Sequence, residues 1–237
     1  MMTPENLAQE LKNIYGDNLV SVVLFGSAAT GEHVDKKSDY NVLVLLTRAD
    51  LAALRLFAAP ARRWVKDGNP LPLFFDERHL RRSLDAFPIE FADIRDGRRV
   101  LHGADVFVNI PINEELLRLE LENELKGKLL QLKQRYLLVA GDAQGLKSLM
   151  TESLSTFLNL FRNALRLFEP VPPVQKMAAL GALAKHLPLD AAVFKEIDDL
   201  RRKGKGTEAG LENIFERYVT AVEAVVEAVD KHIQSKK

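Results

Sequence analysis

The stretch LFGSAATGEHVDKKSDYNV, residues 24–42, decides the fold of this chain. It joins two apolar runs rich in β-branched residues, Val20–Phe25 and Asn41–Leu46. The pattern predicts a strand, a Gly-Ser turn, a helix or loop, and a second strand that opens with the carboxylate of Asp39. Such an arrangement is suited to cradling a phosphate and holding a divalent metal ion beside it.

The turn after the first strand consists of Gly26 and Ser27. A turn directly after a strand leaves backbone N–H groups facing outward, and glycine lets a phosphate oxygen approach the backbone closely. The serine hydroxyl adds a further hydrogen bond to such a phosphate. The pair therefore predicts a phosphate-binding turn, with an ordinary strand-ending turn as the alternative.

The second strand carries Asp39 and Asn41 near its start. Side chains two residues apart in a strand point to the same face, so an acid-x-acid pair there forms a platform for two metal ions. Mg²⁺ is usually held by one or two carboxylates together with substrate phosphates. Asn41 supplies an amide oxygen without charge. Two outcomes stay open: a one-metal or slow enzyme, and a domain that binds nucleotide without turning it over. The alternative for Asp39 is a loop or cap acid.

The run Pro88–Ile94 is predicted to be a strand with Glu90 near its centre. An acid inside a buried strand is costly unless it is paired or bound to metal, which makes Glu90 a candidate site residue. The alternative is an ion pair between Glu90 and Arg95, Arg98 or Arg99.

The chain changes character after about residue 110. Before that point, helices alternate with four or five short strands. The strands are expected at Val20–Phe25, Asn41–Leu46, Leu71–Phe75, Pro88–Ile94 and Arg98–His102.

After Ile112 the pattern predicts about five helices and no strand. Residues 1–110 and 111–237 are therefore expected to form an α/β domain and a helical bundle domain. The long helix Asn113–Val139 carries leucines at three- to four-residue spacing, typical of a bundle core, although a dimer contact is the alternative.

Composition excludes several classes of protein. The 33 basic and 33 acidic residues balance, so a dominant nucleic-acid surface is not expected. The absence of cysteine excludes disulfides and thiolate metal sites. The first residues are polar and no apolar run reaches about 18 residues, so neither a signal peptide nor a membrane span is expected. A cytoplasmic location is the default expectation.

The pattern around the turn resembles the signature of the nucleotidyltransferase superfamily, which includes kanamycin nucleotidyltransferase, poly(A) polymerases, the minimal nucleotidyltransferases and proteins with the DNA polymerase β-like fold. The resemblance covers roughly residues 18–110, and Asn41 departs from the pattern because the family has a second acid there. The helical half resembles helical domains of antibiotic-modifying members only in its placement and helix content. The matching residues are Phe25, Gly26, Ser27, Asp39, Tyr40 and Val42.

The resemblance implies an α+β fold with a mixed sheet, flanking helices and an appended helical bundle. It implies that Gly26 and Ser27 hold the phosphates of a nucleoside triphosphate, and that Mg²⁺ (or Mn²⁺) binds to Asp39, Asn41 and Glu90. Glu90 would activate a hydroxyl acceptor that attacks the α-phosphorus. The alternative is a catalytically inactive nucleotide-binding or regulatory module of the same fold. An aminoglycoside, another small hydroxylated molecule, a protein side chain and an RNA end are all compatible acceptors, and a homodimer is compatible as well.

Overall fold

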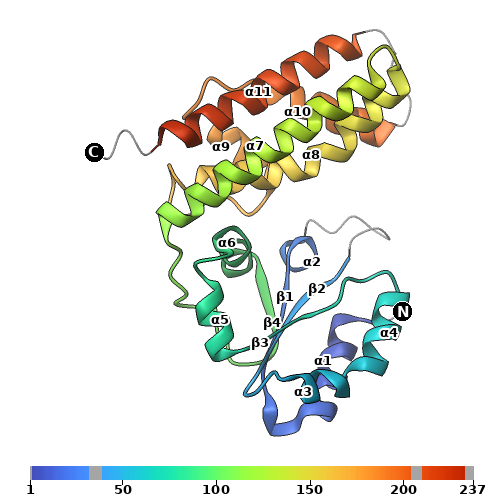
Figure 1. Ribbon diagram of the computed structural model, residues 1–237, viewed down its shortest axis with the longest axis vertical. Coiled ribbons are helices and arrows are strands. Elements are labelled where there is room, and N and C mark those ends of the chain that lie inside the picture. Colours follow the sequence, from blue (N-terminus) through green and yellow to red (C-terminus); the bar gives the residue numbers. More distant parts are fainter. Residues whose placement is uncertain (1, 32–38, 204–209, 233–237) are drawn as a thin grey trace. The chain divides into compact units, whose positions relative to one another are not determined.

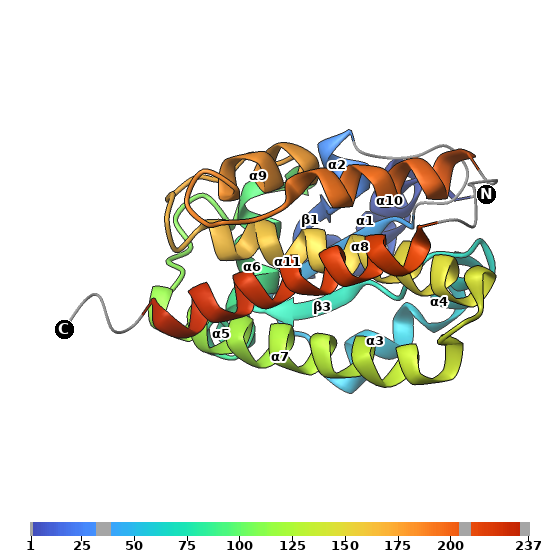
Figure 2. The same ribbon diagram turned by 90° about the horizontal axis from the view of Figure 1, so that it is seen from above.

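The computed structural model describes residues 2–31, 39–203 and 210–232. The chain divides into two compact units, Met1–Asn113 and Glu114–Lys237 (Figures 1 and 2). The first unit contains a sheet with helices and the second consists of helices. Each unit is described by itself below.

The first unit is built on a four-stranded sheet with the order β3-β2-β1-β4. Strand β1 pairs antiparallel with both β2 and β4, whereas β2 pairs parallel with β3, so the sheet is mixed as predicted. All residues of β2 after Asn41 are buried, as expected for a strand covered on both faces. The strands are β1 Leu19–Phe25, β2 Asn41–Leu46, β3 Leu73–Asp76 and β4 Arg98–Gly103.

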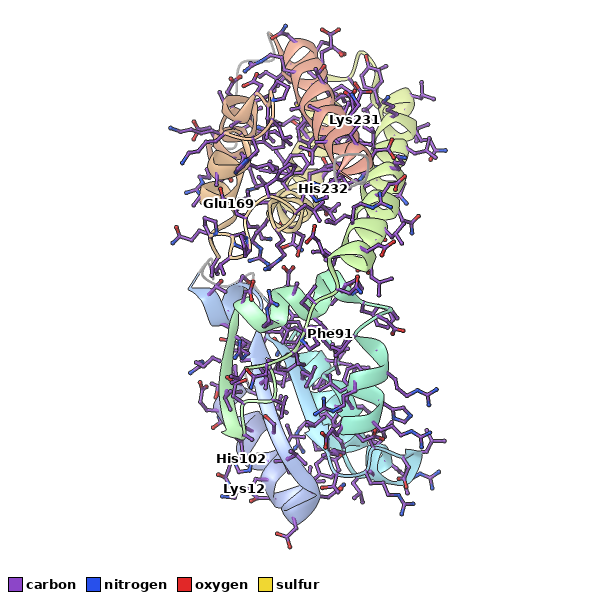
Figure 3. The ribbon with its side chains drawn as sticks, turned by 90° about the vertical axis from the view of Figure 1, so that its left-hand side faces the viewer. Lys12, Phe91, His102, Glu169, Lys231 and His232 are labelled. Carbon is purple, nitrogen blue, oxygen red and sulfur yellow. The ribbon has the colours of Figure 1, made fainter. Side chains whose placement is uncertain are left out.

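One face of the sheet packs against α5 (Glu77–Ser83) and α6 (Pro88–Asp96). The strand residues Val23, Leu43 and Leu45 join the helix residues in this core. Phe91 of α6 lies inside it (Figure 3), with its ring centroid 6.1 Å from Phe75 and 6.4 Å from Phe107. This core fixes α6 against the sheet.

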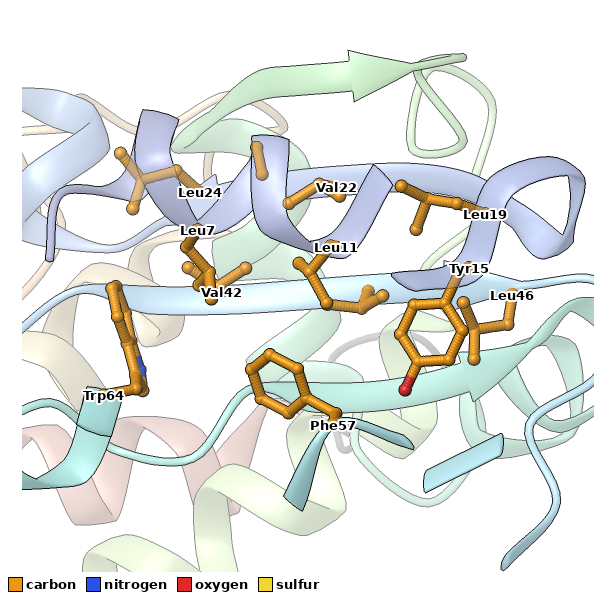
Figure 4. Close-up of a cluster of buried hydrophobic side chains, with 12 residues drawn as sticks. Leu7, Leu11, Tyr15, Leu19, Val22, Leu24, Val42, Leu46, Phe57 and Trp64 are labelled. Atoms are coloured by element: carbon orange, nitrogen blue, oxygen red, sulfur yellow. The ribbon is translucent and has the colours of Figure 1, made fainter. Parts of the chain in front are cut away.

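The opposite face of the sheet packs against α1 (Pro4–Tyr15), α3 (Leu51–Leu56) and α4 (Ala58–Lys66). Helix α1 begins where the Thr3 hydroxyl accepts a hydrogen bond from the backbone N–H of Asn6, and proline at the first helical position suits that start. Figure 4 shows the resulting core. Its labelled side chains are Leu7, Leu11, Tyr15, Leu19, Val22, Leu24, Val42, Leu46, Phe57 and Trp64.

The predicted strand Pro88–Ile94 is wrong, because this segment forms the helix α6, Pro88–Asp96. Proline occupies its first position, where the missing N–H needs no acceptor and the fixed φ suits a helix. The short apolar run fits either a strand or a buried helix by its periodicity alone, so the proline was the better signal.

The helical segment after β2 consists of two helices, α3 and α4, which separate at Phe57. Pro60 lies in the first turn of α4, where backbone N–H groups have no acceptor within the helix, so the proline is tolerated. Phe57 itself is buried and its ring lies 5.3 Å from that of Phe74.

The second unit is a bundle in which α8 packs against α7, α9, α10 and α11. Helix α7 turns a leucine face inward as predicted, although Tyr136 is only half-buried and stacks on Phe215 at 4.7 Å. No helix within the described ranges is long and apolar enough to cross a membrane. The helices are α7 Glu114–Val139, α8 Ala143–Leu165, α9 Lys176–Leu183, α10 Ala191–Lys203 and α11 Leu211–Lys231.

Candidate functional site

Gly26 forms the turn between β1 and the short helix α2 (Ser27–Thr30). Its φ of 76° and ψ of −157° suit glycine and strain other residues. Its carbonyl accepts hydrogen bonds from the N–H groups of Ala29 and Thr30, and its own N–H donates to the carbonyl of Gly97 at 3.3 Å. The turn is therefore fixed from both sides.

Asn41 lies directly beside this turn. It opens β2 and pairs across the sheet with Phe25, the residue before Gly26. A Cβ atom on Gly26 would come within 3.3 Å of Nδ2 of Asn41. The structure thus brings together the Gly-Ser turn and the start of β2, the two parts of the motif identified in the sequence.

Asn69 fixes the entry to β2 and was missed by the sequence analysis. Its side chain is 4% exposed, and its Oδ1 accepts a hydrogen bond from the backbone N–H of Tyr40 at 3.1 Å. Its Nδ2 donates to the carbonyl of Trp64 at 3.4 Å, and the Tyr40 ring lies 6.1 Å from the Trp64 ring. These contacts set the backbone that precedes Asn41 and follows Asp39. An asparagine before a proline signals only a turn, so the sequence held no clear sign of this role.

Asp39 is exposed and directly precedes Tyr40. Side chains alternate along extended backbone, so Asp39 is expected on the same side as Asn41. Its carboxylate and the amide of Asn41 are the two motif side chains at the start of β2.

Glu90 does not lie in a buried strand, which was the reason for choosing it as a candidate site residue. It lies exposed in the first turn of α6, where an acid complements the helix dipole, instead of in a buried strand. The expectation that Glu90 is an acid inside a buried strand was therefore wrong. The three arginines considered as its partners bind other carboxylates. These pairs are Arg95–Asp96, Arg98–Asp105 and Arg99–Glu5.

The neighbouring strand β3 begins with a leucine, not an acid. The parallel register pairs Leu43 with Leu73, and Leu71 precedes the strand. Both Leu71 and Leu73 are exposed. The acid of β3, Asp76, lies at the other end of the strand, where it caps α5 by accepting from the backbone N–H of His79 at 2.8 Å.

One ion pair stabilises β4 next to the turn. Arg98 pairs with Phe25 across the sheet, and its guanidinium donates to Asp105 at 2.8 and 2.7 Å. These hydrogen bonds hold the pKa of Asp105 below its ordinary value. Asp105 therefore remains a carboxylate at neutral pH and keeps Arg98 engaged.

The residues present fit one metal ion rather than two. Within residues 2–31, 39–203 and 210–232, no group of three or more His, Cys, Asp and Glu side chains is placed to hold a metal ion. Asp39 offers a carboxylate and Asn41 an uncharged amide. One carboxylate is enough for a Mg²⁺ ion that keeps its remaining ligands from water and substrate phosphates. A two-metal centre needs more negative charge than this pair provides.

Comparison with known proteins gives a likeness in structure only. No family model matches the chain, and no curated protein matches it in sequence. Among solved structures, the chain is similar to an Enterococcus spectinomycin adenyltransferase, AAD(9), in its crystal structure with ATP and spectinomycin. The TM-score is 0.56 at 14% identity, over 96% of this chain and 98% of that one. The two chains therefore share one architecture along almost their full lengths.

Proposed function

We propose that the protein binds a nucleoside triphosphate together with one Mg²⁺ (or Mn²⁺) ion, and that it transfers nucleotidyl groups slowly or not at all. The proposal starts from the nucleotidyltransferase fold of this chain and its appended helical domain. The Gly26–Ser27 turn would hold the phosphates. Asp39 and the Asn41 amide would be the protein ligands of the metal ion. The one observation that carries the proposal is the closeness of Asn41 to the Gly26 turn, because the resemblance to nucleotidyltransferases implies a second acid at this position and the chain has an uncharged amide.

Each residue of the turn has a separate part in binding. Gly26 has no side chain to keep a phosphate oxygen from its backbone, and the Asn41 amide lies beside it, 3.3 Å from where a Cβ atom would be. Ser27 begins α2, so its N–H has no acceptor within the helix, and its hydroxyl adds a second donor. When bound, the metal ion neutralises phosphate charge, and the carboxylate of Asp39 fixes where that neutralisation occurs.

Slow transfer is the second candidate function, and the likeness to an adenyltransferase supports it. Transfer forms a bond between an acceptor oxygen and the α-phosphorus and releases pyrophosphate, while the acceptor proton passes to a base. Glu90 is the acid proposed for that base, and its solvent exposure leaves it accessible. Strand β3 begins with Leu73, and its acid, Asp76, lies at the other end of the strand.

Nucleotide binding tests the proposal directly. ATP is the first nucleotide to use, since the AAD(9) structure contains it. Calorimetric titration with Mg²⁺ should give binding for wild type, and Asp39→Asn should weaken it about tenfold or more because the charged ligand is lost. Asn109→Asp, an exposed substitution, is the matched control and should leave binding unchanged. Absence of binding with every nucleoside triphosphate tested would overturn the proposal.

Transfer is measured as pyrophosphate release with a panel of hydroxylated acceptors that includes spectinomycin. The turnover rate of the wild-type protein should lie well below the values of about 1–10³ s⁻¹ that are common for enzymes. Asn41→Asp should raise both metal affinity and any transfer, since it restores charge to the platform. Glu90→Gln in the Asn41→Asp background then tests the base. Rapid transfer by wild type would contradict the one-metal proposal while leaving nucleotide binding intact.

A further inference from the structure

Helix α7 carries a second apolar face that points away from the bundle. Leu119, Leu130, Leu137 and Leu138 are 47%, 58%, 77% and 86% exposed. Residues three or four apart share a helix face, which places Asn123 and Gly127 between these leucines. We call Leu119, Asn123, Gly127, Leu130 and Leu137 the outer stripe. The bundle core uses the opposite face of the same helix.

The outer stripe contains a hollow at its centre. A groove of about 370 Å³ is lined by Leu119, Glu122, Asn123, Lys126, Gly127 and Leu130. A Cβ atom added to Gly127 would meet nothing within 4 Å. Glycine inside a helix lowers stability by about 1 kcal/mol relative to alanine. Because nothing in this chain lies close to the Cβ position, packing within the chain does not explain the glycine at 127. Glycine instead allows another helix to approach closely.

The two halves of α7 carry opposite charge. The half before Lys126 has five glutamates and one arginine, and that arginine, Arg118, is buried and bound to Glu122 at 2.7 Å. The half from Lys126 onward has three lysines, one arginine and no acid. A second α7 laid antiparallel would place acidic halves against basic halves, whereas a parallel one would oppose like charges. Antiparallel helices also place opposite dipole ends together.

We infer that the outer stripe of α7 binds the same stripe of a second copy of this chain, antiparallel, with the two-fold axis near Gly127. A two-fold contact uses one self-complementary patch on both subunits, and the opposite charges of the two halves of α7 supply that complementarity. The inference is independent of the proposed function.

Pairs within the chain do not prevent this contact. Lys126 binds Glu122 and Asp230, and Lys133 binds Glu223 at 2.6 Å. Both lysines, Asp230 and Glu223 are exposed, and pairs between exposed groups contribute little to stability. They are therefore free to exchange partners or to rotate aside when a second copy packs onto the leucines.

The oligomeric state is measured by sedimentation equilibrium over a wide range of protein concentration. Wild type should form a dimer. Leu130→Glu should raise the dimer dissociation constant by at least about tenfold, because it removes an apolar contact on both subunits and adds a charge facing the acidic half of the partner. Leu51→Glu, at a leucine that is 81% exposed in the first unit, is the matched control and should dissociate like wild type.

The orientation is measured with single cysteines, since the chain has none of its own. Gly127→Cys lies near the proposed axis and should form a disulfide-linked dimer under mild oxidation. Leu137→Cys lies ten residues away, so its two copies would be about 30 Å apart in the antiparallel arrangement and should not link. Circular dichroism of each variant checks that the helices are retained.

Three results would overturn the inference. They are a wild-type protein that stays monomeric at high concentration, a dimer that Leu130→Glu leaves unchanged, and linking through Leu137→Cys in preference to Gly127→Cys. The last would show a different helix orientation or a different contact.

Discussion

Asn69 shows how one buried amide prepares the candidate site. It holds the N–H of Tyr40, the residue between Asp39 and the strand. Asn69→Ala removes the side-chain acceptor of the Tyr40 N–H and one of the donors to the Trp64 carbonyl, so we expect the free energy of unfolding to fall by about 1–3 kcal/mol. Urea unfolding measures the loss, and Asn109→Ala on the surface is the control. A loss of the same size in both variants would contradict the assigned role.

Glu122 makes the stability of the helical unit depend on pH. Hydrogen bonds from Lys126 and then from Arg118 lower its pKa to about 2, from an ordinary value of 4.5. A lowered carboxylate pKa stabilises the fold above the unfolded value, and this contribution is lost as pH falls from about 4.5 toward 2. The side chain is 24% exposed, so the contribution is about 1 kcal/mol.

The test is thermal unfolding of dilute protein between pH 5 and pH 2. Wild type should lose more stability over this range than Glu122→Gln, which keeps an oxygen acceptor for Arg118 but cannot ionise. Equal losses in the two proteins would assign the acid sensitivity to other carboxylates.

At the scale of elements, the sequence predicts those parts in which local pattern and packing agree. The strands β1 and β2 follow from two apolar runs, the first of which ends at the turn of Gly26, and the structure contains them. The run Pro88–Ile94 is short and apolar enough for either state, and its burial against Phe75 and Phe107 decided for a helix. In the candidate site, too, local pattern predicts some features and tertiary packing decides others. The spacing of the motif predicts that the turn at Gly26 lies near the start of β2. The hydrogen bond of Asn69 and the position of Leu73 beside β2 depend on how distant segments pair, so the sequence does not predict them.

Gly103 ends β4 at a point where only glycine fits. It has a φ of 77°, and a Cβ there would lie 2.0 Å from the carbonyl oxygen of Val20. Gly103→Ala must therefore displace backbone of β1 or β4, and we expect a loss of about 3 kcal/mol or more. Gly181→Ala in α9 is the contrast, since a Cβ there meets nothing within 4 Å and alanine should add up to about 1 kcal/mol. Chemical unfolding compares the two, and a tolerated Gly103→Ala would show that this end of β4 is not constrained.

At the scale of the whole molecule, each unit contains its own buried side chains. The first has cores on both faces of its sheet, and the second buries leucines and aromatic rings among α7, α8, α10 and α11. A unit with its own core is able to fold alone. We expect chains comprising residues 1–113 and 114–237 to unfold cooperatively when expressed separately. Circular dichroism with thermal unfolding checks this, and a fragment without a cooperative transition would show that its core depends on the other unit.

The single hydrogen bond from the Gly26 amide to the Gly97 carbonyl has a consequence for detecting ligands. That hydrogen bond links the turn to the corner where α6 meets β4, so the exchange rate of the Gly26 amide proton reports on ligand binding at the turn. A ligand that rigidifies the turn will slow its exchange with deuterium, whereas one that draws the N–H to itself will also release the corner and speed exchange around Gly97. Hydrogen exchange followed by NMR can thus distinguish these two modes of ligand binding before any complex is crystallised.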